Sequence, residues 1–168
     1  MNEIPALDPA VAAAVAAAGI EAEILACAPD LADTAAFCAH YGYDPGGAAN
    51  TIVVAAKTDP VRYAACVALA TTKLDVNKKV CAVMGVKRAS FASADQTLAL
   101  TGMMIGGVTI PGLPADLPIY IDAAVMTKDR VIIGGGNRSS KLLLAPAELT
   151  KLPGVQIIDG LAVGIAPR

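Results

Sequence analysis

Side chains that usually perform acid–base or nucleophilic chemistry are scarce in this chain of 168 residues. His40 is the only histidine, so a Ser-His-Asp triad would depend on it alone. It ends a short predicted helix beside Tyr41 and Tyr43, where a surface or half-buried structural role is the simpler interpretation. Asp30 and Asp33 do not form a convincing catalytic pair, because they are expected in a loop and at a helix start. If the chain is an enzyme, we expect its chemistry to come from backbone groups or from the substrate.

A glycine-rich segment from Gly134 to Lys141 follows a predicted strand and could bind an anion. It reads Gly-Gly-Gly-Asn-Arg-Ser-Ser-Lys, which gives the pattern G-x-G-x-x-S. A dinucleotide-binding fingerprint needs a third Gly or Ala that opens a helix, whereas a strand is expected here from Lys141 to Leu144. The phosphate-binding pattern G-x-x-x-x-G-K-[ST] is not matched either. Backbone N–H groups together with Arg138 and Lys141 could still bind an anion, and a plain hairpin turn is the alternative.

Cysteine usage gives no sign of a metal centre or of a disulfide framework. The four cysteines are Cys27, Cys38, Cys66 and Cys81, and no CxxC pair occurs. Cys38 and His40 could both contact a metal ion, but no second pair of ligands accompanies them. Glu3 and Asp8 stand where a secretory signal would carry basic residues. We therefore expect buried free thiols, no metal, no cofactor and a cytoplasmic protein.

The composition excludes some classes of protein and leaves one charge asymmetry to explain. With 55% hydrophobic and 17% charged residues, the chain is too apolar to be disordered. Its longest apolar run, residues 10–20, is shorter than the roughly 20 residues that span a membrane.

Residues 1–56 contain seven acids and no Lys or Arg (−7), and residues 57–168 contain all 13 bases and eight acids (+5). The basic part is typical of a polyanion-binding surface, or each charge simply solvates its own face. No helix-turn-helix or basic-helix pattern supports DNA binding.

Periodicity and turn residues predict short helices and strands in alternation. Helices are expected at about 9–18, 34–40, 76–84, 93–101 and 145–152, with Asp8, Asp75 and Ser93 as N-caps. Strands are expected at 20–27, 51–56, 61–70, 87–91, 119–122, 131–133, 141–144 and 155–158. The 51–56 and 61–70 runs should form a hairpin around the Asp59-Pro60 turn. Because both tight turns and helices join the strands, we expect one compact domain, residues 1–168. It should hold a mixed, curved α/β sheet flanked by helices rather than a doubly wound one.

Four segments occur in an order and spacing that a known family shares. They are the helix Thr34 to His40, the strand Asn50-Thr51-Ile52-Val53-Val54, the loop Thr101 to Gly112 and the segment Val131 to Ser140. Together they resemble the YbaK/EbsC family of aminoacyl-tRNA editing domains, over about residues 20–160. The resemblance implies a pocket for the aminoacyl end of tRNA. It also implies hydrolysis of the ester that links a wrong amino acid to the terminal ribose.

The same resemblance implies a set of site residues. The family's G-x-x-x-P loop matches Gly107 to Pro111, so that the Gly106 and Gly107 amides would bind the ester carbonyl and Pro111 would fix the loop's exit. Asn50 would orient the carbonyl or the ribose. The other implied substrate-binding residues are Thr34, Thr51, Gly135, Gly136, Arg138, Ser139 and Ser140. The residues expected to meet acceptor-stem phosphates are Lys87, Arg88 and Lys141.

Asn50 departs from the family pattern, which usually has a lysine at this position. Lys57 lies seven residues further along, roughly 23 Å away on an extended strand, and cannot replace it. Asparagine can donate a hydrogen bond but brings no positive charge. Two functions therefore stay open. One is a free-standing deacylase that acts on the acceptor end of a mischarged tRNA, with a synthetase as a further candidate partner. The other is a non-catalytic module that binds an aminoacyl group, a nucleotide or a partner protein. No membrane or DNA partner is expected.

Overall fold

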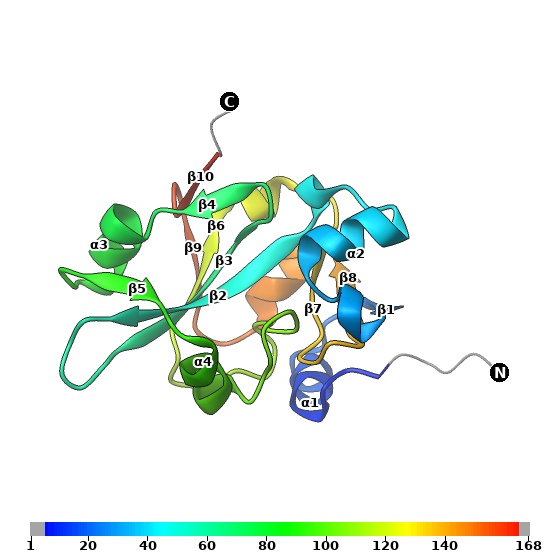
Figure 1. Cartoon of the computed structure of the whole chain (residues 1–168), viewed down its shortest axis with the longest axis horizontal. Helices are drawn as coiled ribbons and strands as arrows, with labels where there is room; N and C mark the ends of the chain where they lie inside the picture. The colour runs from blue at the N-terminus through cyan, green and yellow to red at the C-terminus, as the bar shows by residue number, and fades with distance from the viewer. Residues whose placement is uncertain (1–5, 165–168) are drawn as a thin grey trace.

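The structure, a computed structural model, describes residues 6–164 and is built around a five-stranded mixed sheet (Figure 1). In order across the sheet, the strands are β5 (Ala89–Phe91), β2 (Ala49–Ala56), β3 (Tyr63–Leu69), β6 (Ile119–Asp122) and β9 (Val155–Ile158). β2 pairs antiparallel with β3 and β5, whereas β6 is parallel to β3 and β9. All of β3 except Tyr63 is buried, as expected for an apolar central strand covered on both faces. The predicted hairpin and the predicted mixed α/β class are confirmed.

A second sheet lies against the first and carries the glycine-rich segment. Its antiparallel strands, in order, are β1 (Glu23–Ala26), β8 (Ser140–Leu144) and β7 (Val131–Gly134). A parallel bridge between Ala48 and Ile132 joins the start of β2 to β7. Because the bridge is parallel, Gly134 comes level with Asn50 two residues further along. A third sheet, β4 (Thr72–Leu74) with β10 (Ala162–Gly164), was not predicted, because three-residue strands contain too little alternation to detect.

The helices follow their capping residues closely. α1 (Pro9–Ala18) begins at Asp8, whose side chain accepts from the Ala10 N–H, and α4 (Ala94–Thr101) begins at the capping box of Ser93 and Gln96. The other helices are α2 (Thr34–Tyr41) and α3 (Cys81–Met84). The short helical turns are Pro29–Leu31, Pro45–Gly47, Val76–Val80, Ala123–Thr127 and Pro146–Lys151.

Two of the predicted helices differ from the structure. The predicted 76–84 helix opens with a π-helical turn over Val76–Val80, and Asp75 makes no side-chain capping bond. The predicted 145–152 helix is a 3₁₀ helix, Pro146–Lys151, closed by Pro153 just beyond its end. Six residues between two prolines leave little room for α-helical bonds.

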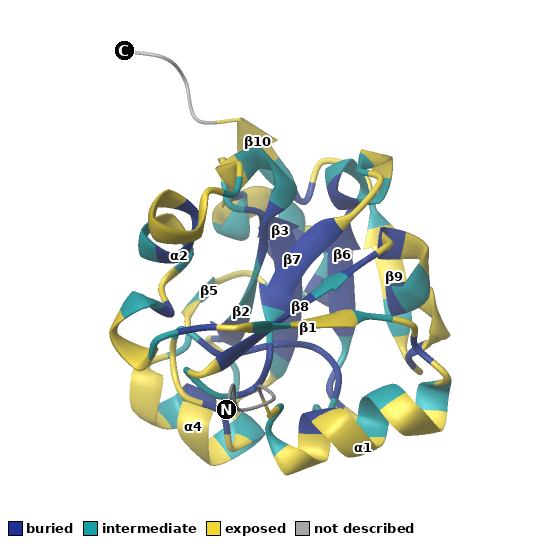
Figure 2. Cartoon of the chain, turned by 90° about the vertical axis from the view of Figure 1, so that its right-hand side faces the viewer, coloured by how far each residue is buried: buried dark blue, intermediate teal, exposed yellow. Residues whose placement is uncertain are grey.

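Hydrophobic packing joins the layers into one body. Figure 2 shows β3, β6 and β7 as buried strands and α1 as a mostly exposed helix along one side. The largest core cluster lies between the two main sheets, and Val67, Ile121 and Ile133 are among its members. A second cluster, with Val80, Met84 and Leu161, covers the opposite face of the five-stranded sheet. A third forms around Phe37 of α2 and Ile132 of β7.

All four cysteines are buried and free, which confirms the predicted thiols. His40 is exposed, and residues 6–164 contain no group of three or more His, Cys, Asp or Glu that could hold a metal ion. No helix in this part of the chain is long and apolar enough to cross a membrane.

Candidate functional site

A cavity of about 420 Å³ lies beside the first half of β2. Small and apolar side chains form most of its lining, from α2, β2, β7, α4 and the loop after α4. The polar lining residues are Asp33, Thr34, Asn50, Thr51, Thr97 and Lys141. An apolar hollow with a few converging polar groups is typical of a small-ligand site.

The cavity occupies a gap along one edge of β2. Even-numbered residues of β2 bond to β3, since Ala70 N donates to Ala48 O and Ala56 N donates to Arg62 O, each at 2.8 Å. Odd-numbered residues therefore turn their N–H and C=O groups to the other edge. On that edge β7 bridges at Ala48 and β5 pairs with residues 54–56, and no described strand pairs between them. The backbone groups of Thr51 thus face the cavity.

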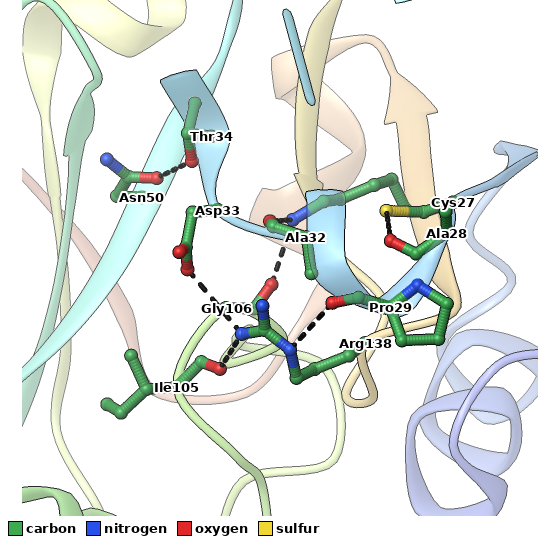
Figure 3. Close-up of polar contacts among 11 residues, drawn as sticks. Cys27, Ala28, Pro29, Ala32, Asp33, Thr34, Asn50, Ile105, Gly106 and Arg138 are labelled. Atoms are coloured by element: carbon green, nitrogen blue, oxygen red, sulfur yellow. Dashed lines mark hydrogen bonds and ion pairs between the residues drawn. The ribbon is translucent and has the colours of Figure 1, made fainter. Parts of the chain in front are cut away.

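Thr34 and Asn50 form a hydrogen-bonded pair in the cavity wall. The Thr34 hydroxyl donates to the Asn50 side-chain oxygen (Figure 3). Thr34 is the first residue of α2 and Asn50 the second of β2, so this bond ties the helix start to the open edge of the strand. No described group accepts from the Asn50 NH₂ group, so this group can donate to a ligand. The structure brings together these two residues that the sequence singled out.

Gly106 lines the same cavity and has a backbone donor that no described group uses. Arg138 Nη1 donates to Ile105 O at 2.7 Å, and its Nε donates to Pro29 O at 2.9 Å (Figure 3). In a trans peptide the C=O and the following N–H point in opposite directions. By holding the Ile105 carbonyl, Arg138 therefore directs the Gly106 N–H away from the guanidinium. No acceptor in residues 6–164 takes this N–H, although Gly106 lines the cavity.

Gly107 and Pro111, which were expected to share the catalytic role, do not line the cavity. The Gly107 N–H is used internally, because it donates to Met104 O at 2.9 Å and closes a turn. Close packing excludes a side chain at Gly107, since a Cβ there would lie 2.3 Å from Asn137 O. Pro111 is buried in the loop that follows. The prediction of an amide pair is thus corrected to a single free amide, that of Gly106.

Lys141 was expected to contact tRNA phosphates, and the structure contradicts this. The residue is 5% exposed, and its Nζ donates to Ala32 O at 2.5 Å and to Gly106 O at 2.8 Å. Nζ also lies 5.7 Å from the centre of the Phe37 ring. Burial lowers the pKa of Lys141 from its ordinary value. β8 is buried on both faces apart from Leu143, so alternation in the sequence could not show which way this lysine points.

Most of the glycine-rich turn, which was predicted to bind substrate, lies outside the cavity lining. Gly136 N donates to Gly107 O at 2.7 Å, and a Cβ at Gly136 would lie 2.5 Å from Val11 Cγ2. Ser139 N and Ser140 Oγ both donate to Asn137 Oδ1, which shapes the turn internally. The predicted substrate-binding residues that do not line the cavity are Gly135, Gly136, Arg138, Ser139 and Ser140. Gly134 lines it instead.

Lys87 and Arg88 are exposed and lie beyond the opposite end of β2. They precede β5, whose Ala89 pairs with Ala56, six residues from Asn50. This corresponds to roughly 20 Å along the strand, so any phosphate contact there would be distant from the cavity.

Several lining residues carried no signal in the sequence. Thr97 is 3% exposed and belongs to α4, where a lone threonine has no distinguishing pattern. Phe37 and Ile132 enter the lining through packing between distant elements. Only a three-dimensional arrangement brings them to one cavity.

The fold of this chain has close structural counterparts. The crystal structure of hypothetical protein APE2540 has a TM-score of 0.81 and 23% identity, over 92% of this chain and 99% of that chain. The structure of a candidate trans-editing enzyme for prolyl tRNA synthetase has a TM-score of 0.77 and 22% identity, over 92% and 98%. At these identities the likeness shows the fold.

The sequence itself shows the family. The aminoacyl-tRNA editing domain pattern matches residues 28–152, and the chain belongs to this family, which confirms the predicted resemblance. Uncharacterized protein YwhH of Bacillus subtilis (strain 168) is 36% identical over 85 residues, or 51% of this chain and 53% of YwhH. The match thus spans about half the length of that relative.

Proposed function

We propose that the chain is a free-standing aminoacyl-tRNA deacylase that hydrolyses the ester of a mischarged tRNA. Membership of the editing-domain family supports this at the level of the class. The observation that carries the proposal is that Gly106, whose N–H no described acceptor takes, and Asn50, whose NH₂ group can donate, line one cavity. Two donors of this kind suit a carbonyl oxygen that becomes an anion.

The reaction needs little from ionisable side chains. Water adds to the ester carbonyl carbon, and the carbonyl oxygen becomes an oxyanion that Gly106 N–H and Asn50 NH₂ stabilise. The bond from that carbon to the ribose oxygen then breaks, and the ribose oxygen receives the proton that water gave up. Removing one such donor costs about 3–4 kcal/mol in a well-studied hydrolase.

Proton transfer falls to the substrate or to water. The described lining contains one carboxylate, Asp33, which is exposed and lies 3.5 Å from Arg138 Nη1. No histidine lines the cavity, since His40 is exposed on α2. In place of a protein side chain, a hydroxyl of the terminal ribose or the substrate's amino group would accept the proton from water.

Lys87 and Arg88 are proposed to contact the acceptor stem beyond the cavity. Both are exposed and positively charged on the basic part of the chain. Such contacts make tRNA binding weaker as salt rises from 50 to 200 mM. A double Lys87→Gln, Arg88→Gln variant should show a shallower salt dependence and an unchanged rate at saturating tRNA.

A non-catalytic binding module is the second candidate, because Asn50 brings no charge to the strand edge. Single-turnover deacylation of Ala-, Cys-, Ser- and Thr-charged tRNA separates the two. The deacylase hypothesis predicts hydrolysis of at least one of them and a roughly 100- to 1,000-fold slower rate in Asn50→Ala. Asn77→Ala is the matched control, because Asn77 is exposed and lies outside the cavity lining.

If no charged tRNA is hydrolysed above background, the deacylase proposal is wrong. Binding of a non-hydrolysable, amide-linked aminoacyl-adenosine would then support the module. Asn50→Lys adds a third comparison. A gain of hydrolysis would mean that the native site is weak, and a loss would mean that Asn50 has a role of its own.

A further inference from the structure

The positive charge of the cavity comes from a residue outside β2, the strand that carries Asn50. Among the described lining residues, Asp33 and Lys141 are charged, and Lys141 is the one cation. It lies on β8, far along the chain from Asn50, yet both residues line the same cavity. The neutral Asn50 thus faces a cavity whose positive charge enters from a different sheet.

Lys141 is held in a way that is costly for a purely structural residue. It is 5% exposed, and none of the ion pairs found in residues 6–164 includes it. Two backbone carbonyls and the face of the Phe37 ring partly replace its water. A neutral amide side chain could join the same two carbonyls without burying a charge. The charge itself therefore calls for an explanation.

Lys141 acts on the residue that carries the free donor. Its Nζ binds Gly106 O while Arg138 binds Ile105 O, so successive peptides on both sides of Gly106 are fixed by cations of one hairpin. The other Lys141 bond, to Ala32 O, ties this loop to the residues just before α2. Lys141 binds the carbonyl of the same residue whose N–H would bind the substrate oxygen. Its positive charge therefore also stabilises the negative charge that develops on that oxygen.

We propose that Lys141 is a positioning residue that fixes Gly106 and supplies the positive charge that stabilises the oxyanion in the cavity. The proposal rests on the deacylase function proposed above. It assigns to β8 the electrostatic role that Asn50 at the start of β2 cannot perform. The role depends on charge, and this separates it from a simple link between two loops.

Lys141→Gln is the decisive variant, because glutamine keeps an N–H donor and removes the charge. We expect kcat for deacylation to fall 10- to 100-fold with KM within threefold. Lys151→Gln is the matched control, since Lys151 Nζ also binds a backbone carbonyl, Gly19 O at 3.0 Å, but lies outside this cavity. Unchanged kcat in Lys141→Gln would overturn the proposal.

The pH profile gives a readout that a structural link would not move. Burial lowers the pKa of Lys141, Arg138 acts in the same direction, and Cys27, Cys38 and Asp33 oppose them. Because the charged form is lost as pH rises, kcat should fall in alkaline solution, earlier than for an exposed lysine. This limb should disappear in Lys141→Gln, and its persistence would contradict the proposal.

A second experiment, an NMR titration, needs neither a substrate nor a variant. In ¹³C-labelled wild-type protein, the Gly106 carbonyl and Lys141 Cε resonances are followed while pH is raised. The proposal predicts one shared midpoint, below that of exposed lysines. A Gly106 carbonyl that does not follow Lys141 would overturn it. If wild type hydrolyses no tRNA but the shared midpoint is found, the deacylase proposal is wrong. The interaction by which Lys141 positions Gly106 is then still supported.

Discussion

Gly106 and Gly136 both have a positive φ, +94° and +87°, and both lie in glycine-rich segments, yet their N–H groups differ in use. Gly136 donates to Gly107 O at 2.7 Å, whereas no acceptor in the described residues takes the Gly106 N–H. Around Gly136, the space of a Cβ is filled by Val11 and Asp8. A Cβ at Gly106 would meet Arg138 Nη1, so both glycines are closely packed, and they differ in whether the N–H has an acceptor. Glycine content alone therefore does not identify an anion site, because an N–H that already has an acceptor within the protein is not available to an anion.

The largest effect is expected where glycine serves packing. In Gly107→Ala, the new Cβ would lie 2.3 Å from Asn137 O, so the free energy of unfolding should fall by about 3 kcal/mol. Gly47→Ala is the matched control, because nothing lies within 4 Å of its Cβ position and its φ is not positive. Urea denaturation measures both. Equal stabilities of the two variants would contradict the packing role.

A smaller effect, on rate rather than stability, is expected at Arg138. Arg138→Met keeps much of the side-chain volume but releases the Ile105 and Pro29 carbonyls. Because the orientation of the Gly106 N–H is then no longer fixed, kcat should fall about 10-fold, or about 1.4 kcal/mol. Arg130→Met is the control, since Arg130 is exposed and, within residues 6–164, pairs with Glu23 alone. If both variants keep the wild-type kcat, Arg138 does not orient the donor.

Coupling between Thr34 and Asn50 should be about 1 kcal/mol in kcat/KM. Thr34→Val releases the Asn50 oxygen, so the NH₂ group loses its fixed orientation. A double-mutant cycle of Thr34→Val and Asn50→Ala measures this coupling in the deacylation assay. Additive effects would show that the two residues act independently.

An effect of similar size, on stability rather than rate, concerns Thr109, in the same loop as Gly107. Its hydroxyl is buried and has no partner in residues 6–164, so Thr109→Val should raise the free energy of unfolding by about 1 kcal/mol. Thr101→Val should act in the opposite direction, because the Thr101 hydroxyl donates to Thr97 O and accepts from Met103 N. Denaturation of both variants tests the pair. A destabilised Thr109→Val would mean that this hydroxyl has a partner.

Local signals in the sequence predicted the fold better than the site. Asp8 and Ser93 fixed two helix starts, because a capping bond depends on neighbours in the chain. The resemblance identified Thr34, Asn50 and Gly106, all of which line the cavity. The direction of Lys141 could not be predicted, because its strand is buried on both faces nearly throughout. The partners of Gly107 and Gly136 come from distant segments, so their packing role was equally hidden.

The position of a bound ester mimic tests the comparison of Gly106 with Gly136 most directly. A crystal structure with an amide-linked aminoacyl-adenosine would show which groups bind its carbonyl oxygen. We predict that this oxygen lies about 3 Å from Gly106 N and from Asn50 Nδ2, within hydrogen-bonding distance. A carbonyl oxygen bound at Gly134 to Gly136, or away from Gly106 altogether, would contradict the account.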